Sequence, residues 1–165
     1  MCSSDLRRLA QGLNLLELLL AVGLLTLITA LGTVSLYRFR AQATIGAAAN
    51  ALQLALLRAR ATALSTGLSV SLCAADSRGR CAAGMAGNGY RSTRVDGVIL
   101  EQATLPQGLR LRSNRPQITY GPTPRAGTTA TLTVCDPTVP EATRQVIISQ
   151  TGRPRVAATP AAPCG

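Results

Sequence analysis

The sequence predicts an α+β fold in which one long N-terminal helix packs on a C-terminal antiparallel β-sheet. Residues 13–37 are apolar or small almost throughout, residues 38–66 continue with helical periodicity, and residues 67–165 hold short strand-like runs separated by Gly and Pro. Hydrophobic residues make up 47% of the 165 residues and aromatic residues only 2%, so the core must be built from Leu, Val, Ile and Ala. We therefore expect a small domain with an anchor.

The chain is strongly basic. All 17 basic residues are Arg, and with seven acidic residues they give a formal net charge of +10. Such a charge suits an anionic partner, either nucleic acid or a lipid headgroup surface. A GC-rich genome that favours Arg codons explains the same excess without a partner, and composition alone does not decide between the two.

Residues 13–37 form the first predicted element, and Glu17 is their only charged residue. About 25 residues at about 1.5 Å each make a helix that can cross a hydrocarbon core of about 30 Å. The run is too long for the apolar region of a cleaved secretory signal, which has about 7–15 residues. We therefore expect a single membrane-spanning helix, whose orientation the flanking arginines do not fix.

Glu17 is unusual in such a helix. On insertion scales a carboxylate at the bilayer centre costs about 2.5–3.5 kcal/mol, so that an unpaired one is expected to be rare and functional. The segment holds no basic residue at a helical spacing that could pair with it. We therefore expect its cationic partner to be created by processing or supplied by another subunit.

The stretch from Gly12 to Leu18, GLNLLEL, resembles the type IV pilin and pseudopilin signature. The resemblance implies that prepilin peptidase cleaves between Gly12 and Leu13 and methylates the new amine of Leu13. Glu17 would then pair with that amine of a neighbouring subunit. The chain has Leu13 where the family usually has Phe, and a plain signal anchor that tolerates Glu17 is the alternative. Residues 1–12 are the expected leader, of which residues 1–6 are typical of a translated sequencing adapter.

Residues 38–66 carry an apolar stripe at spacings of three and four, and Gly67 supplies a stop signal. The stripe consists of Ile45, Ala48, Leu52, Ala55, Leu56, Ala59 and Ala63. Period-two patterning then predicts the strands of one antiparallel sheet, within residues 68–73, 97–102, 109–113, 117–121, 129–135 and 144–149. Residues 74–94 and 121–129 are predicted loops because Gly, Pro, Ser and Arg dominate them.

Two blocks resemble the GspH/FimT family of pilin-like proteins. Residues 51–73 match a helix that ends in an Ala-Arg-x-x-Ala pattern before a strand closing on Cys, and residues 131–156 match a strand, Cys, strand and Gly-Arg-x-Arg. The chain lacks the Trp of the family's central segment, where only Gly89 and Tyr90 take its place. The resemblance implies a subunit of a pilus or pseudopilus, anchored in the bacterial inner membrane with its head in the periplasm. Its partners would be prepilin peptidase and other pilins.

Four cysteines remain once Cys2 is set aside, an even number that suits an oxidising periplasm. Of the three possible pairings we favour Cys73–Cys81, which closes a loop, with Cys135–Cys164, which tethers the tail. A metal site is not expected, because the chain has no His and no close Cys-x-x-Cys pair. We expect neither catalysis nor a cofactor, since no general base stands near a nucleophile.

The tail SQTGRPRV, residues 149–156, holds the remaining candidate site. Gly152 permits close backbone approach, and Pro154 holds the chain extended, so that Arg153 and Arg155 can point to one side. Both guanidinium groups can bind phosphate, and Arg144 on the preceding strand adds a third positive charge. In the FimT branch of the family the Gly-Arg-x-Arg element binds DNA during natural transformation. The alternative is that these charged residues only keep the end of a strand hydrated and bind no partner.

Two hypotheses follow. The first is a minor pilin of a type IV pilus that binds double-stranded DNA weakly and without sequence preference, because few aromatic residues are available to stack on bases. The second is a structural subunit, either a GspH-like minor pseudopilin of a type II secretion system or a pilus-priming subunit. The charge of +10 and the Arg153 and Arg155 pair favour the first.

Overall fold

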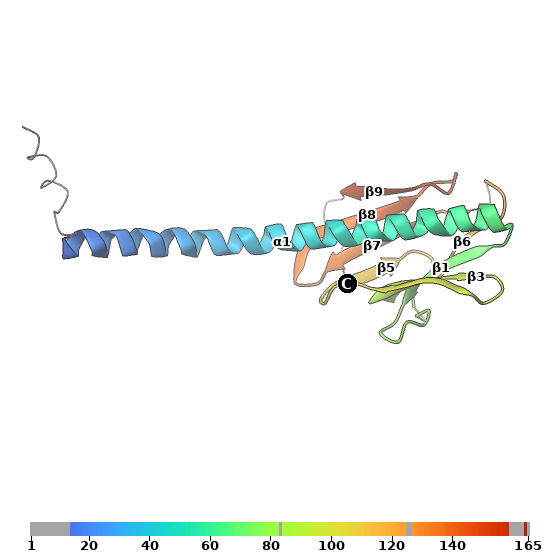
Figure 1. Ribbon diagram of the computed structural model, residues 1–165, viewed down its shortest axis with the longest axis horizontal. Helices are drawn as coiled ribbons and strands as arrows, with labels where there is room; N and C mark the ends of the chain where they lie inside the picture. Colours follow the sequence, from blue (N-terminus) through green and yellow to red (C-terminus); the bar gives the residue numbers. More distant parts are fainter. Residues whose placement is uncertain (1–13, 83, 125–126, 159–163, 165) are drawn as a thin grey trace, which may run out of the picture. The chain divides into compact units, whose positions relative to one another are not determined.

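The structure is a computed structural model that describes residues 14–82, 84–124, 127–158 and 164, and for residues 30–35, 140 and 158 it describes the backbone alone. The chain divides into two units, residues 1–37 and 38–165. One helix, α1 (Leu15–Thr66), supplies residues to both units (Figure 1).

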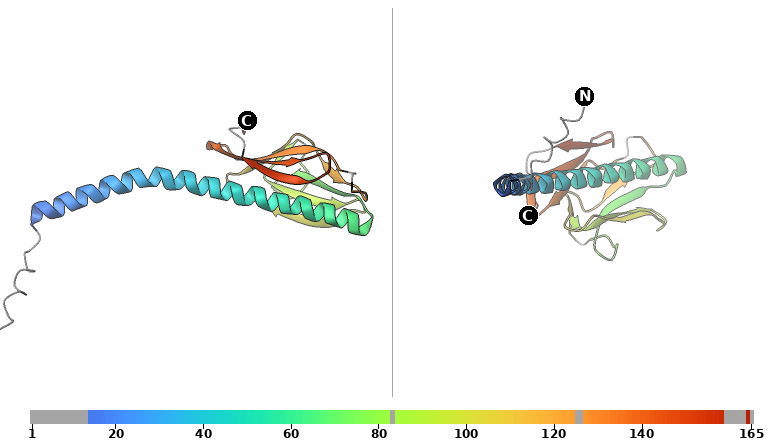
Figure 2. Two further views of the ribbon diagram at one scale, coloured as in Figure 1. Left: turned by 90° about the horizontal axis from the view of Figure 1, so that it is seen from above. Right: turned by 60° about the vertical axis from the view of Figure 1, so that its left-hand side comes forward.

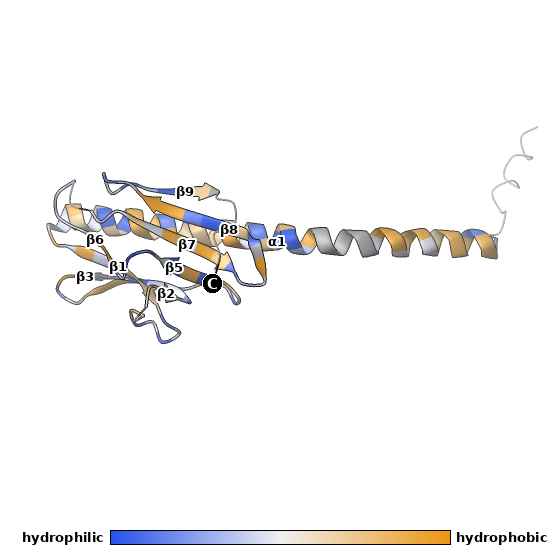
Figure 3. Ribbon diagram, turned by 180° about the vertical axis from the view of Figure 1, so that it is seen from behind, coloured by the Kyte–Doolittle hydropathy of each residue, from blue (hydrophilic) through white to orange (hydrophobic). Residues whose placement is uncertain are grey.

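The first unit contains the apolar start of α1. Its described Leu, Val and Ile side chains are exposed, and this part of the helix is coloured hydrophobic in Figure 3. The predicted membrane-spanning helix over residues 13–37 lies partly outside the described residues. Among the described residues, no helix is long and apolar enough to cross a membrane.

The second unit contains the rest of α1 and the strands. In the described part of the chain these are β1 (Val70–Ala75), β2 (Ala86–Gly87), β3 (Gly89–Arg94), β4 (Ile99–Thr104), β5 (Arg110–Ser113), β6 (Ile118–Tyr120), β7 (Ala130–Asp136), β8 (Val139–Ile148) and β9 (Pro154–Ala158). The six predicted strands correspond to β1, β4, β5, β6, β7 and β8. The α+β fold with a long helix on antiparallel strands is therefore confirmed.

The strands form two sheets where the sequence predicted one. One sheet has the order β4-β3-β1-β6, and the other has the order β2-β5-β7-β8-β9. The prediction of a loop over residues 74–94 was wrong, because β3 pairs with all six residues of β1. The composition of β3, GYRSTR, hid its alternation: Tyr90 and Ser92 are buried, and the arginines between and after them are half-buried. Pairing on both sides, with β1 and β4, outweighs its weak strand propensity.

The core lies between α1 and the two sheets (Figure 2). All seven residues of the predicted apolar stripe are buried, with 6% exposure or less, and Ala49 joins them. Five of these eight residues are Ala, and short side chains allow a helix to approach a sheet closely. Gly67 ends the helix as predicted: it adopts φ 68°, and its N–H donates to the Ala63 carbonyl at 3.1 Å.

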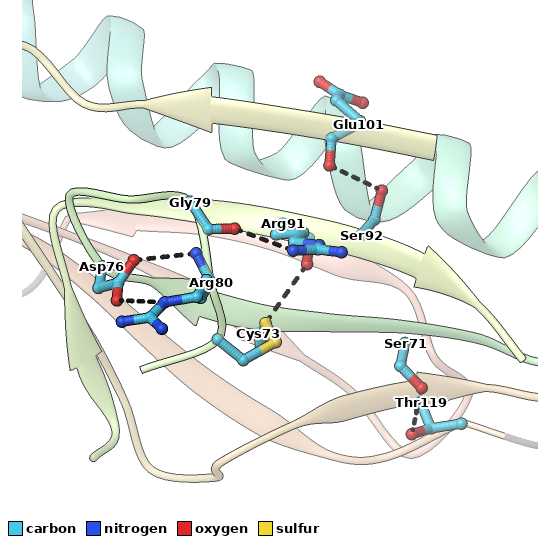
Figure 4. The surroundings of a disulfide bond; sticks show 10 residues. Ser71, Cys73, Asp76, Gly79, Arg80, Arg91, Ser92, Glu101 and Thr119 are labelled. Atoms are coloured by element: carbon cyan, nitrogen blue, oxygen red, sulfur yellow. Dashed lines mark hydrogen bonds and ion pairs between the residues drawn. A yellow bond between two sulfur atoms is a disulfide. The ribbon is translucent and has the colours of Figure 1, made fainter. Parts of the chain in front are cut away.

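Tertiary contacts fix the four-stranded sheet at two places. The Cys73–Cys81 disulfide closes the loop after β1, and the Arg91 guanidinium donates to the Gly79 carbonyl at 3.3 Å in the same loop (Figure 4). Toward the helix, Arg58 contacts Glu101 of β4 at 3.4 Å, and the Tyr90 hydroxyl donates to the same carboxylate at 3.2 Å. An exposed ion pair such as Arg58–Glu101 adds little stability, so burial of the α1 face holds the sheet in place.

Burial on α1 can be tested with two leucines two positions apart. Leu52 is fully buried and Leu54 is 48% exposed. We expect Leu52→Ala to lower the free energy of unfolding by about 2–5 kcal/mol, because it leaves a cavity in the core. Leu54→Ala should change it by less than about 0.5 kcal/mol. Urea unfolding of the full chain in detergent, followed by circular dichroism, measures both, and equal losses would contradict this account of the core.

Candidate functional site in the tail hairpin

The residues predicted from the sequence fall in different parts of the chain. Gly12 and Leu13 lie outside the described residues. Glu17 lies in the first turn of α1, where its negative charge is favourable beside the positive end of the helix dipole. The Arg-containing tail forms strand β9 and the turn before it, far along the chain from Glu17.

Strands β8 and β9 form a hairpin, which we call the tail hairpin (residues 139–158). Its turn is closed by two backbone hydrogen bonds, from Gly152 N–H to the Ser149 carbonyl at 2.8 Å and from Ser149 N–H to the Arg153 carbonyl at 3.2 Å. The Ser149 hydroxyl also lies 2.8 Å from that of Thr151. A short hairpin loop of this kind ends in a residue with positive φ, and Gly152 supplies it with φ 70°.

Gly152 is buried and faces its own protein. A Cβ atom added there would lie 3.3 Å from Cε1 of Tyr120, and one added at Gly127 would lie 3.3 Å from the Gly152 Cα. Tyr120 is 1% exposed, and burial raises the pKa of its hydroxyl to about 12. The close approach that the sequence predicted for Gly152 is therefore made to Tyr120, which gives this glycine a positioning role.

Arg153 and Arg155 lie on the same side of β9. Both are exposed, whereas Gly152 and Pro154 are buried, and this alternation over four residues follows the period of an extended strand. The amide of Gln53 on α1 donates to the Pro154 carbonyl at 3.1 Å and ties the strand to the helix between the two arginines. The two arginine side chains thus leave an anchored backbone on the same side.

Arg144 does not join them. Residues directly opposite each other in an antiparallel pair share a face, and Arg144 is opposite Ala158 while Arg155 is opposite Ile147. Arg144 therefore shares the face of Val146 and Ile148, which are buried under α1. Its guanidinium donates to the Thr143 carbonyl of its own strand at 3.0 Å. The structure separates Arg144 from the arginine pair by the thickness of the sheet.

Both favoured disulfide pairings are present, Cys73–Cys81 and Cys135–Cys164. The second joins β7 to the segment that follows β9, across 29 residues. A loop of this size contributes about 3–4 kcal/mol in the chain-entropy account of disulfide stabilisation. The tail hairpin is thus held on one side by Gln53 and on the other by this disulfide.

Sequence reasoning missed three contributors to the site: Tyr120, Gln53 and Ser149. The sequence places Tyr120 and Gln53 far from the tail, and nothing in one sequence pairs them with it. Ser149 could have been identified, since Ser at the start of a turn that ends in Gly is a common turn signal. Among the described residues, no group of three or more His, Cys, Asp or Glu side chains could hold a metal ion.

The role of Gly152 can be tested against a second glycine. Gly152→Ala should lower the free energy of unfolding by about 1–2 kcal/mol, because an L-residue is strained at positive φ and its Cβ would press on Tyr120. Gly46 lies within α1, and a Cβ there meets nothing within 4 Å, so Gly46→Ala should stabilise by about 0.5–1 kcal/mol. Urea unfolding of the full chain measures both changes, and a stabilising Gly152→Ala would refute the positioning role.

Solved structures of two pilin-like proteins are similar to this chain. The Pseudomonas aeruginosa type IV minor pilin FimU superimposes with a TM-score of 0.56 at 20% identity, covering 73% of this chain and 99% of the pilin. The minor pseudopilin EpsH from the Type 2 Secretion System of Vibrio cholerae gives a TM-score of 0.53 at 17% identity, covering 69% of this chain and 96% of EpsH. At these identities the likeness establishes the pilin-like fold. A sequence comparison with curated proteins finds no significant match.

A comparison with protein families matches residues 48–152 to the family described as Type II transport protein GspH. The match runs from the buried face of α1 through both sheets to the turn of the tail hairpin. It covers more than half of the chain and agrees with the resemblance carried by residues 51–73 and 131–156. This chain therefore belongs to the GspH family and has its pilin-like fold.

Proposed function

We propose that the protein is a non-catalytic minor pilin subunit that binds extracellular double-stranded DNA through Arg153 and Arg155, as a step in DNA uptake. The observation that carries the proposal is the tail hairpin, which holds two exposed arginines on one side of an anchored strand. Arginine binds phosphate through charge-assisted and often bidentate hydrogen bonds. Fixing the backbone that carries both arginines lowers the entropy that binding would otherwise cost.

The charge distribution supports an anionic partner. Three acidic side chains among the described residues of the head pair with nearby arginines: Asp76 contacts Arg80, Asp96 contacts Arg94, and Glu101 contacts Arg58. These ion pairs belong to α1, the four-stranded sheet and its loops, and none of them involves Arg153 or Arg155. Backbone contacts of this kind carry no sequence information, and we expect binding without sequence preference.

Neutralising the arginine pair tests the proposal. Arg153→Gln/Arg155→Gln should lower the affinity for a fluorescent DNA duplex by at least about tenfold, and the slope of log K against log salt should fall by about 1.8 for two lost phosphate contacts. Fluorescence anisotropy of the full chain in an uncharged detergent measures both. Wild-type affinity should be micromolar or weaker at physiological salt.

The matched control is Arg58→Gln/Arg78→Gln, which lowers the net charge equally but leaves the tail hairpin unchanged. Arg58 lies on α1 and Arg78 lies in the loop after β1, and both are exposed. If the control loses as much affinity as the tail variant, binding depends on net charge and the tail is not the site. If the wild type fails to bind duplex DNA at low salt, the proposal is wrong.

A structural role in protein secretion is the second candidate. The family is described as Type II transport protein, and one of the similar structures is a pseudopilin of a secretion system. In that case the arginine pair only keeps the edge of the sheet hydrated and binds no DNA. The protein then acts through contacts with other pseudopilins. The genes next to this one separate the two candidates, because pilus assembly genes favour the first and secretion genes favour the second.

For either role we propose that the protein is first inserted in the inner membrane with its head in the periplasm. It then assembles into a filament through α1. Cleavage between Gly12 and Leu13 by prepilin peptidase would leave a methylated amine, and Glu17 would pair with the amine of the next subunit. The exposed apolar side chains at the start of α1 support burial among neighbouring helices, since a large exposed apolar surface marks an interaction site.

Glu17→Gln tests this assembly step. Removing the charge should keep the protein out of filaments while leaving its folding unchanged, because Glu17 is exposed in the first turn of α1. The measurement is the share of tagged protein in sheared filaments compared with the cell fraction. Glu141→Gln, at an exposed acid of the head, is the control and should enter filaments like the wild type. Equal incorporation of the Glu17 variant would refute the pairing.

A further inference from the structure

The face of the five-stranded sheet opposite α1, which we call the outer face, extends from the arginine pair to β5. Residues opposite each other on neighbouring strands form rows of side chains across this face. One row consists of Arg155, Ile147 and Thr131. The next row, two residues along, consists of Ala157, Gln145, Thr133 and Arg112. Arg112 is exposed and lies on the same face as Arg155, three strands away.

A cavity of about 310 Å³ lies beside Arg112. Its lining consists of Met85, Arg112, Ser113, Asn114, Thr131 and Thr133. Apart from Met85 these residues offer hydroxyl, amide or guanidinium groups, which are the side chains that contact DNA phosphates. Thr131 belongs both to this lining and to the row of Arg155, so that the cavity and the arginine pair share one continuous surface.

Negative charge lies away from these two rows. Among the described residues of β5, β7, β8 and β9, the acidic ones are Asp136 and Glu141. Asp136 pairs with Val139 at the turn between β7 and β8, and Glu141 lies four residues before Gln145. Between them and Arg112, the row of Cys135 and Thr143 is buried, and Cys135 carries the disulfide to Cys164. The two rows therefore contain Arg112 and Arg155 and no acidic residue, and the buried row of Cys135 and Thr143 separates them from Asp136 and Glu141.

We propose that Arg112 and this cavity hold a further phosphate of the same DNA duplex, which then crosses the outer face from β9 to β5. The inference rests on the proposed DNA binding. Strands lie about 4.8 Å apart and residues about 3.3 Å apart along a strand, so the Cα atoms of Arg112 and Arg155 are separated by roughly 16 Å. The major groove of B-DNA is about 12 Å wide, and two arginines with this spacing can contact phosphates on both sides of it.

The salt dependence of binding tests the contact. Each phosphate contact adds about 0.9 to the slope of log K against log salt, so three arginines predict a slope of about −2.7. Arg112→Gln should reduce it to about −1.8 and weaken binding equally for duplexes of different sequence. Anisotropy titrations of the full chain in an uncharged detergent, over a series of salt concentrations, give the slope. Arg78→Gln, with the same change in net charge in the loop after β1, should leave it unchanged.

The outcomes separate this inference from the function on which it rests. If Arg153→Gln/Arg155→Gln abolishes binding and Arg112→Gln changes neither slope nor affinity, the tail is the DNA site and the β5 contact is refuted. If Arg112→Gln and Arg78→Gln reduce binding alike, the effect is one of net charge and the contact is again refuted. If the wild type binds no duplex, both proposals fail. Circular dichroism of each variant shows that the fold is retained.

Discussion

The head depends on the packing of one small-residue face of α1 against two sheets at once. That face carries Ile45, Leu52 and Leu56 between five alanines, and each of these residues is almost completely buried. The two sheets have separate hydrogen-bond ladders, so that the helix and the shared core hold them together. Removing apolar volume from this face therefore affects both sheets, whereas the exposed side of α1 contributes no side chain to the core.

The position of the tail hairpin also depends on how the two sheets pack together. Tyr120 ends β6 in the four-stranded sheet, and Gly152 belongs to the turn that leads into β9 in the five-stranded sheet. Their contact joins the two sheets directly beneath the arginine pair. The Tyr120 hydroxyl has no hydrogen-bond partner among the described residues, so Tyr120 contributes the packing of its ring. The position of Arg153 and Arg155 is thus set by residues from both sheets and from α1.

The sequence was sufficient to predict features that depend on local patterns. The buried stripe of α1, the stop at Gly67 and six strands follow from periodicity and from glycine. Four cysteines left three pairings open, and the favoured one is present. Features that depend on pairing between distant residues were missed. Strand β3 is polar in composition and is fixed by its two neighbours, and Arg144 was grouped with Arg155 because no single sequence reveals the register of β8 and β9. The Tyr120 contact with Gly152 was missed for the same reason.

Strand β9 is the edge of its sheet, and this position has a consequence for how copies of the chain behave together. An edge strand presents unpaired backbone groups to which another chain can add a strand, and natural proteins prevent this with proline and with positive charge. Pro154 has no N–H to offer, and Arg153 and Arg155 on either side of it repel the same edge of a second copy. The residues that face outward on β9 therefore also protect the protein from aggregation wherever many copies are crowded at one surface.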